Sequence, residues 1–215
     1  MIFPSLKNKK FGYVNLNLES QKWTETHPGS SLVDPTVCEK MVLDVHKKYS
    51  IDFSYGGWME DRSFLWHGSY LDTWGEYIHL GVDLNVPTGT SVAADFDAKV
   101  IAIEDDYPEV GGWGPTVTLK HATKPVYLLY AHLDRNILCK PGDLLKAGTV
   151  FATVGKAPFN GNWFPHLHVQ VISSSFYEEI EKKKAWKEID GYGSAEEIED
   201  HAKHFADPMQ YISLT

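Results

Sequence analysis

The sequence predicts a mainly β fold, with an antiparallel β-sheet or sandwich core and peripheral helices at both ends. Two observations lead to this prediction. Between residues 71 and 173, short runs of β-branched or alternating apolar residues are separated by turn-forming stretches such as GGWGP and KPGDLLKAGT. These connections are too short for the crossover helices of a parallel sheet, so neighbouring strands are expected to be antiparallel. On both sides of this region, the pattern becomes helical.

The N-terminal part, residues 1–70, contains one predicted helix, from Asp34 to Lys48. Asp34 can cap the first turn, Pro35 fits the first helical position, and Lys48 suits the negative C-terminal end of the helix dipole. The apolar stripe expected to face the core consists of Val37, Met41, Val42 and Val45. We expect this part to be an extension packed on the β core.

Strand patterns fill the central part of the chain, and helical patterns follow in the C-terminal part. The clearest strand patterns are AKVIAIEDD, PTVTLKH, PVYLLYAHL, TVFATVG and HLHVQVI, all within residues 71–173. Residues 174–215 contain FYEEIEKKKAWKEI and SAEEIEDHAKHF, which are polar and helical, with acid–base pairs four residues apart. The chain is therefore predicted to have a β core at 71–173 and a helical C-terminal extension at 174–215.

Composition excludes several classes of function. The chain of 215 residues has 29 acidic and 20 basic side chains, a net charge of −9, which argues against nucleic acid or an anionic membrane as a partner. No apolar run reaches the ~18 residues of a membrane span. The first residues lack the apolar stretch of a signal peptide, so a cytoplasmic location is expected, with another export route left open. Two cysteines cannot form a disulfide framework or a four-cysteine zinc site.

The stretch NWFPHLHVQV places two histidines one residue apart in a predicted strand. Because strand side chains alternate, His166, His168 and Gln170 would share one face, while the apolar residues between them face the core. In YIHLGVD, His79 and Asp83 are four residues apart and would also share a strand face. A hydrogen bond between these two is the simpler reading of that pair taken alone.

Together these segments predict a metal centre. A catalytic zinc site uses three protein ligands and keeps one position open for water. His79, Asp83 and one histidine of the HLH stretch supply three ligands. The remaining HLH histidine and His132, from LLYAHLDR, could act as general base and proton donor. The other histidines are expected to be surface or hydrogen-bonded residues: His27, His46, His67, His121, His201 and His204.

The motifs HLGVD, YAHL and HLH, in this order, resemble the lysostaphin-like (LytM-type) zinc metalloendopeptidases. The resemblance covers about residues 76–172 and includes VPTGTSVAA, VTLKH and PGDLLKAGTVFATVG between the motifs. It implies an antiparallel β core with a narrow groove that carries the metal. It also implies hydrolysis of a peptide bond in bacterial peptidoglycan, often beside glycine.

Residue by residue, the resemblance implies His79, Asp83 and His168 as Zn²⁺ ligands, and His132 and His166 as catalytic histidines. The roles of the last two, one as base and one as oxyanion stabiliser, stay open. The expected partner is thus a peptide or peptidoglycan substrate.

The approach to the HLH motif, APFNGNWFP, differs from the small, glycine-rich stretch that is common in the family. Its bulky residues Trp163 and Phe164 are expected to reshape the groove, with Trp163 lining it. NGNWFPHLHVQ and GWGPTVTLKH are similar to a branch whose domain accompanies aminotransferase domains. That similarity leaves an intracellular, non-cell-wall substrate as an alternative.

Two further alternatives come from other classes. One is a catalytically quiet metal-binding or regulatory domain, although all five matching positions are occupied. The other is a non-haem iron oxygenase, because two histidines and an aspartate also form its facial triad. That triad typically has a closely spaced HxD or HxE with a distant histidine, rather than HxxxD. Oxygenases that use 2-oxoglutarate usually also need a basic residue, often arginine, for its carboxylate, and this chain has only Arg62 and Arg135.

Overall fold

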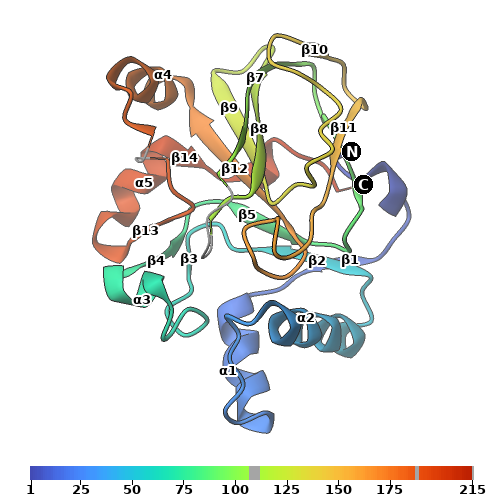
Figure 1. Ribbon diagram of the computed structural model, residues 1–215, viewed down its shortest axis with the longest axis vertical. Helices are drawn as coiled ribbons and strands as arrows, with labels where there is room; N and C mark the ends of the chain where they lie inside the picture. The colour runs from blue at the N-terminus through green and yellow to red at the C-terminus, as the bar shows by residue number, and fades with distance from the viewer. Residues whose placement is uncertain (107–111, 187–188, 215) are drawn as a thin grey trace.

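The computed structural model describes residues 1–106, 112–186 and 189–214. Its largest sheet confirms the mainly β prediction (Figure 1). All neighbouring strands in this sheet are antiparallel except the pair β1 and β2. The strands, in spatial order, are β1 (Phe11–Tyr13), β2 (Phe53–Gly56), β5 (Val82–Asn85), β12 (Leu167–Ser173), β9 (Val126–Ala131), β8 (Pro115–His121), β7 (Ala98–Asp105) and β10 (Leu144–Leu145), with β14 (Phe205–Ala206) beside β12.

One face of this sheet forms the main apolar core. Leu167, Val169 and Val171 of β12 lie in it, together with side chains from a two-stranded sheet of β6 (Ser91–Ala93) and β11 (Val150–Thr153), and from the residues before the short helix η1 (Pro4–Leu6). Burying an aliphatic side chain contributes about 1.5–3 kcal/mol. A one-residue slip of β12 would put His168 into this core, so apolar burial fixes the register.

The opposite face of β12 is covered by other elements. They are a three-stranded sheet of β13 (Tyr192–Ser194), β4 (Glu76–His79) and β3 (Glu60–Asp61), helices α4 (Ser174–Lys183) and α5 (Ile198–His204), and the 3₁₀ turn η3 (Ala195–Glu197). A further turn, η4 (Pro208–Gln210), precedes the C-terminus. The alternation predicted for HLHVQV is therefore present, and its polar face is enclosed between two sheets.

The N-terminal segment contains α1 (Leu16–Thr26), α2 (Pro35–Tyr49) and α3 (Tyr70–Trp74). α2 is the predicted helix, and the Asp34 side chain accepts hydrogen bonds from the backbone N–H groups of Thr36 and Val37. The prediction of a single helix is wrong because it missed α1. The buried residues of α1 include polar ones, Asn17, Glu19 and Ser20, so its sequence lacks a clear apolar stripe.

The segments outside the β core are not separate from it. β1 and β2 extend the main sheet, whereas β3 and β13 extend the small one, so both ends of the chain add strands beside the site. The two termini lie side by side in Figure 1, and the Ile2 N–H donates to the Ser213 carbonyl at 2.9 Å. Within the described ranges, no helix is both long and apolar enough to cross a bilayer.

Candidate metal centre

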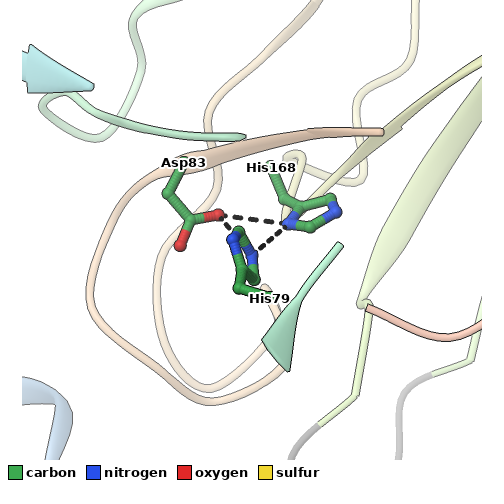
Figure 2. Close-up of side chains that lie close together, drawn as sticks. All are labelled: His79, Asp83 and His168. Atoms are coloured by element: carbon green, nitrogen blue, oxygen red, sulfur yellow. Dashed lines mark hydrogen bonds and ion pairs between the residues drawn. The ribbon is translucent and has the colours of Figure 1, made fainter. Parts of the chain in front are cut away.

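Three side chains predicted from two separate motifs meet between the two sheets (Figure 2). Asp83 in β5 and His168 in β12 are directly opposite each other across the strand pair. The prediction that His79 and Asp83 share a strand face is wrong, because the chain leaves one sheet and enters the other between them. His79 ends β4 of the small sheet and points toward both of the other side chains. All three are at most 2% exposed. The structure thus brings together the histidine and aspartate of HLGVD with the second histidine of HLH.

The glycine of HLGVD makes this approach possible. A Cβ atom on Gly81 would lie 2.5 Å from ring atoms of His168 and 2.7 Å from the Val169 carbonyl oxygen. Contacts this short do not occur for real Cβ atoms, and the backbone carbonyl cannot move aside without breaking β12. A glycine is therefore required at position 81, where the chain packs closely against β12. Such close approach is typical of an isolated glycine between strand residues.

Hydrogen bonds fix the tautomers of both imidazoles. Nδ1 of His79 lies 3.0 Å from the Gly57 carbonyl oxygen, which can only accept, so Nδ1 carries the proton. Nε2 of His168 lies 3.1 Å from Oε1 of Gln170. The Gln170 amide is oriented because its Nε2 donates to the Asp190 carbonyl at 3.0 Å. The inward-facing nitrogens, Nε2 of His79 and Nδ1 of His168, are consequently lone-pair donors.

Three lone-pair atoms therefore face one another. Nε2 of His79 is 3.0 Å from Nδ1 of His168, and Oδ1 of Asp83 is 3.3 Å from the first and 3.1 Å from the second. With the outer nitrogens protonated, these contacts have no hydrogen to share, and the arrangement suits a cation. Zinc bonds of 2.0–2.1 Å in tetrahedral geometry separate two ligand atoms by about 3.3 Å. The donor set fits a metal ion of this size.

Protonation states at neutral pH agree with metal binding. Burial, followed by the charge of Arg62, lowers the pKa of His79 to about 3. Burial would raise the pKa of Asp83, but the imidazoles and Arg62 around it hold that pKa well below its ordinary value. A neutral imidazole and an ionised carboxylate are the forms that bind metal.

These shifts predict that the metal-free protein loses stability in mild acid. Unfolded histidine titrates near 6.5, whereas folded His79 titrates at about 3. Between these values the unfolded chain binds a proton that the folded chain does not. The stabilisation is thus complete above about pH 6.5 and is lost as the pH falls toward 3. Urea unfolding of chelator-treated protein between about pH 8 and 5 should show this decline.

A free energy of unfolding that stays constant from about pH 7 to 5 would contradict the prediction. Burial also lowers the pKa of His132 and of His166. Replacing both by Asn should therefore make the decline less steep.

The two predicted catalytic histidines lie beside the ligand cluster. Nδ1 of His166 donates to the Phe164 carbonyl at 2.7 Å, and Nδ1 of His132 donates to the Asn160 carbonyl at 2.8 Å. Their ring centroids are 4.2 Å apart. Nε2 of His166, which carries the lone pair, is 3.8 Å from Oδ1 of Asp83. Both imidazoles are thus held in tautomers that accept a proton on the side of the cluster.

His132 has the backbone conformation of a constrained site residue. Its φ angle is +61°, in the left-handed region that non-glycine residues rarely adopt. Its N–H donates to the Trp113 carbonyl at 2.9 Å, and its carbonyl accepts from the Gly155 N–H at 2.9 Å. Such strain persists where surrounding structure enforces it, and it is common at functional sites.

Trp163 and Phe164, the bulky residues before the HLH motif, are placed differently from the expectation. Trp163 does not line a groove; it is buried, stacks obliquely on Trp66 at 4.5 Å, and donates from Nε1 to the Leu32 carbonyl at 3.1 Å. The Trp163 ring meets His166 edge-on at 5.2 Å, and the Phe164 ring stacks on His166 at 4.8 Å. These aromatic residues fix the His166 ring.

Sequence reasoning missed one charged residue at the centre. Arg62 is fully buried, and its Nη1 donates to Oδ2 of Asp83 at 2.6 Å. The other arginine, Arg135, pairs with Asp105 at 2.9 Å. Both arginines are thus engaged by carboxylates of the protein, which further weakens the oxygenase alternative.

A cavity of about 250 Å³ adjoins the site along the same sheet face. Its floor includes Thr118 and Leu129, which are in register with Gln170 across β8, β9 and β12. Directly paired residues share a face, so this floor continues from the row of His168. Trp113 lines the cavity and lies 5.0 Å from the His168 ring. None of the five predicted site residues lines this cavity.

Comparisons with known proteins agree with these motifs. Residues 77–180 match the model of peptidase family M23. The solved structure of the antimicrobial peptidase lysostaphin from Staphylococcus simulans is 25% identical, with a TM-score of 0.43, over 62% of this chain and 43% of that chain. A zinc-containing peptidase from Vibrio cholerae is 30% identical, with a TM-score of 0.37, over 46% of this chain and 28% of that one.

The catalytic domain of the prophage-encoded M23 protein EnpA from Enterococcus faecalis, solved as a mutant, is 30% identical, with a TM-score of 0.38. That alignment covers 45% of this chain and 68% of the EnpA domain. This chain therefore spans less than half of the lysostaphin and Vibrio structures that it matches. A search of curated proteins found no match.

Proposed function

Because this chain belongs to peptidase family M23 through residues 77–180, we propose that it is a zinc-dependent endopeptidase. His79, Asp83 and His168 would hold Zn²⁺, and His132 and His166 would transfer protons. The observation that carries the proposal is the convergence of three lone-pair atoms at 3.0–3.3 Å, each held from behind by hydrogen bonds. The ordered match of five residues to the family motifs supports it.

The chemistry divides between the ion and the histidines. When bound, Zn²⁺ supplies Lewis acidity, which lowers the pKa of water toward about 7 and polarises a carbonyl group. His166 and His132 are neutral at pH 7 because burial lowers the pKa of each. One of them takes the proton of the attacking water at Nε2 and becomes an imidazolium. The imidazolium stabilises the developing oxyanion and then passes the proton to the leaving amine.

Geometry favours His166 as the first acceptor. Its Nε2 lies 3.8 Å from Asp83 Oδ1, whereas His132 contacts the cluster through the ring of His166, with 6.1 Å between the ring centroids of His132 and His168. Water that attacks a carbonyl beside the cluster would thus meet His166 first.

The proposed substrate is a peptide, with peptidoglycan and glycine-containing peptides as the leading candidates. The match to a peptidase family supports a peptide as the substrate. Lysostaphin, which this chain resembles, is an antimicrobial peptidase. If these candidates are not cleaved, the alternatives are an intracellular peptide substrate or a regulatory role without turnover.

The test is mass spectrometry of purified peptidoglycan and glycine-rich peptides after incubation with zinc-loaded protein. We expect new peptide ends that disappear with Asp83→Ala and persist with Asp200→Ala. Asp200 is a suitable control because it is an exposed aspartate on α5, paired with Lys203. Cleavage that persists with Asp83→Ala would overturn the proposed mechanism. Zinc binding without cleavage would move the search to other peptides.

A further inference from the structure

A buried arginine reaches the candidate metal centre from outside the residues that match the family. Arg62 follows β3 and is 0% exposed. Its Nε donates to Glu60 Oε1 at 3.0 Å, and its Nη1 donates to Asp83 Oδ2 at 2.6 Å and to the Tyr192 hydroxyl at 3.0 Å. A guanidinium without water needs such partners, since an unpaired buried charge is strongly destabilising.

The small sheet sets the position of this arginine relative to His79. In the strand register, Glu60 of β3 and Tyr192 of β13 are both paired with His79 of β4, one on each side. The partners that flank Arg62 are therefore fixed to the same strand position that supplies a metal ligand. Neither β3 nor β13 lies within residues 77–180, so the segments outside the family match complete this site.

The absence of a side chain at Gly57 leaves room for the Arg62 guanidinium. A Cβ atom on Gly57 would lie 2.4 Å from Nη2 of Arg62 and 2.5 Å from Nδ1 of His79. Gly57 has a φ angle of +111°, and its carbonyl is the acceptor that fixes the His79 tautomer. The turn before β3 thus positions His79 and Arg62 together.

The two oxygens of Asp83 have different partners. Oδ1 faces the lone-pair nitrogens of His79 and His168 at 3.3 and 3.1 Å, whereas Oδ2 accepts the 2.6 Å bond from Arg62. We propose that Arg62 is a positioning residue that holds Oδ2, so that Asp83 offers the metal a single oxygen. This inference rests on the proposed metal site. Outer contacts of this kind orient metal ligands and set the affinity of the site.

The test compares Arg62→Met, Arg62→Lys and the control Arg135→Met. Arg135 is half-exposed and pairs with Asp105 away from the cluster. Binding of Co²⁺ and Zn²⁺ to chelator-treated protein should weaken by about 10–100-fold in Arg62→Met. The visible absorption of bound Co²⁺ should also fall in intensity, because Asp83 can then bind through both oxygens and raise the coordination number.

Arg62→Lys keeps the charge but lacks the planar fork that reaches Glu60, Asp83 and Tyr192 together. Its affinity and Co²⁺ spectrum should lie between those of the wild type and Arg62→Met, and Arg135→Met should match the wild type. If Arg62→Met does not fold, a folded Arg62→Lys with wild-type affinity and spectrum would overturn the inference, as would wild-type values in Arg62→Met. A wild type that binds neither metal would instead overturn the proposed function.

Discussion

Replacing His166 by Asn is expected to lower kcat by about 10²–10⁴-fold, the range for loss of a general base, without loss of the bound metal. Nδ1 of His166 donates to the Phe164 carbonyl, and the ring is buried between aromatic side chains, so its other nitrogen is left for proton transfer. The Asn amide can still donate to that carbonyl but cannot take a proton from water. Steady-state kinetics on a cleaved peptide, with metal content measured on the same sample, would show the separation.

His67→Asn is the control, because the His67 side chain is 83% exposed. It should leave both kcat and metal content unchanged. Full turnover by His166→Asn would refute a catalytic role for this residue. Loss of metal from His166→Asn would instead assign His166 to the ligand set.

Replacing Asp83 by Ala is expected to remove the metal and to destabilise the protein by about 3–5 kcal/mol, the usual cost of breaking a buried ion pair by removing one partner. The proposed metal site loses its only carboxylate ligand. Arg62, fully buried, loses the carboxylate that accepts its shortest hydrogen bond. Metal analysis of the purified variant and urea unfolding in the presence of chelator measure the two effects separately.

The chelator matters because it removes the contribution of metal binding to stability. Asp200→Ala should keep the metal, and its free energy of unfolding should stay within about 0.5 kcal/mol of the wild type, as for most surface substitutions. An Asp83→Ala protein that retains its metal would show that Asp83 is not a ligand. An Asp83→Ala protein as stable as the wild type would show that the buried Arg62 does not need Asp83 as its partner.

The part of the candidate site that could be predicted from the sequence consists of residues in alternating strand patterns and in the family motifs. His168 and Gln170 share a face of β12, and His166 directly precedes the strand. The apolar residues that alternate with them can be read without a structure. An isolated glycine within a strand pattern is typical of close backbone approach, and the structure shows such an approach between Gly81 and His168. The division of the chain into an extension, a β core and a second extension stays a prediction.

The remaining contacts depend on strand pairings between distant segments. Arg62 and Tyr192 meet at Asp83 because β3 and β13 flank β4, and no periodic pattern in either short strand predicts those pairings. Trp163 was expected in a groove because it lies near His166 in sequence. Its burial against Trp66 depends on where the N-terminal segment packs, which proximity in sequence does not reveal.

The most direct test of the metal centre is long-range ¹H–¹⁵N NMR of the histidine side chains in chelator-treated protein, before and after one equivalent of Zn²⁺. We predict that His79 binds through Nε2 and His168 through Nδ1, while the opposite nitrogens keep their protons toward Gly57 and Gln170. Chemical shifts of metal-bound nitrogen at those two positions would confirm the arrangement. Unchanged spectra on zinc addition, or binding of His168 through Nε2, would contradict it.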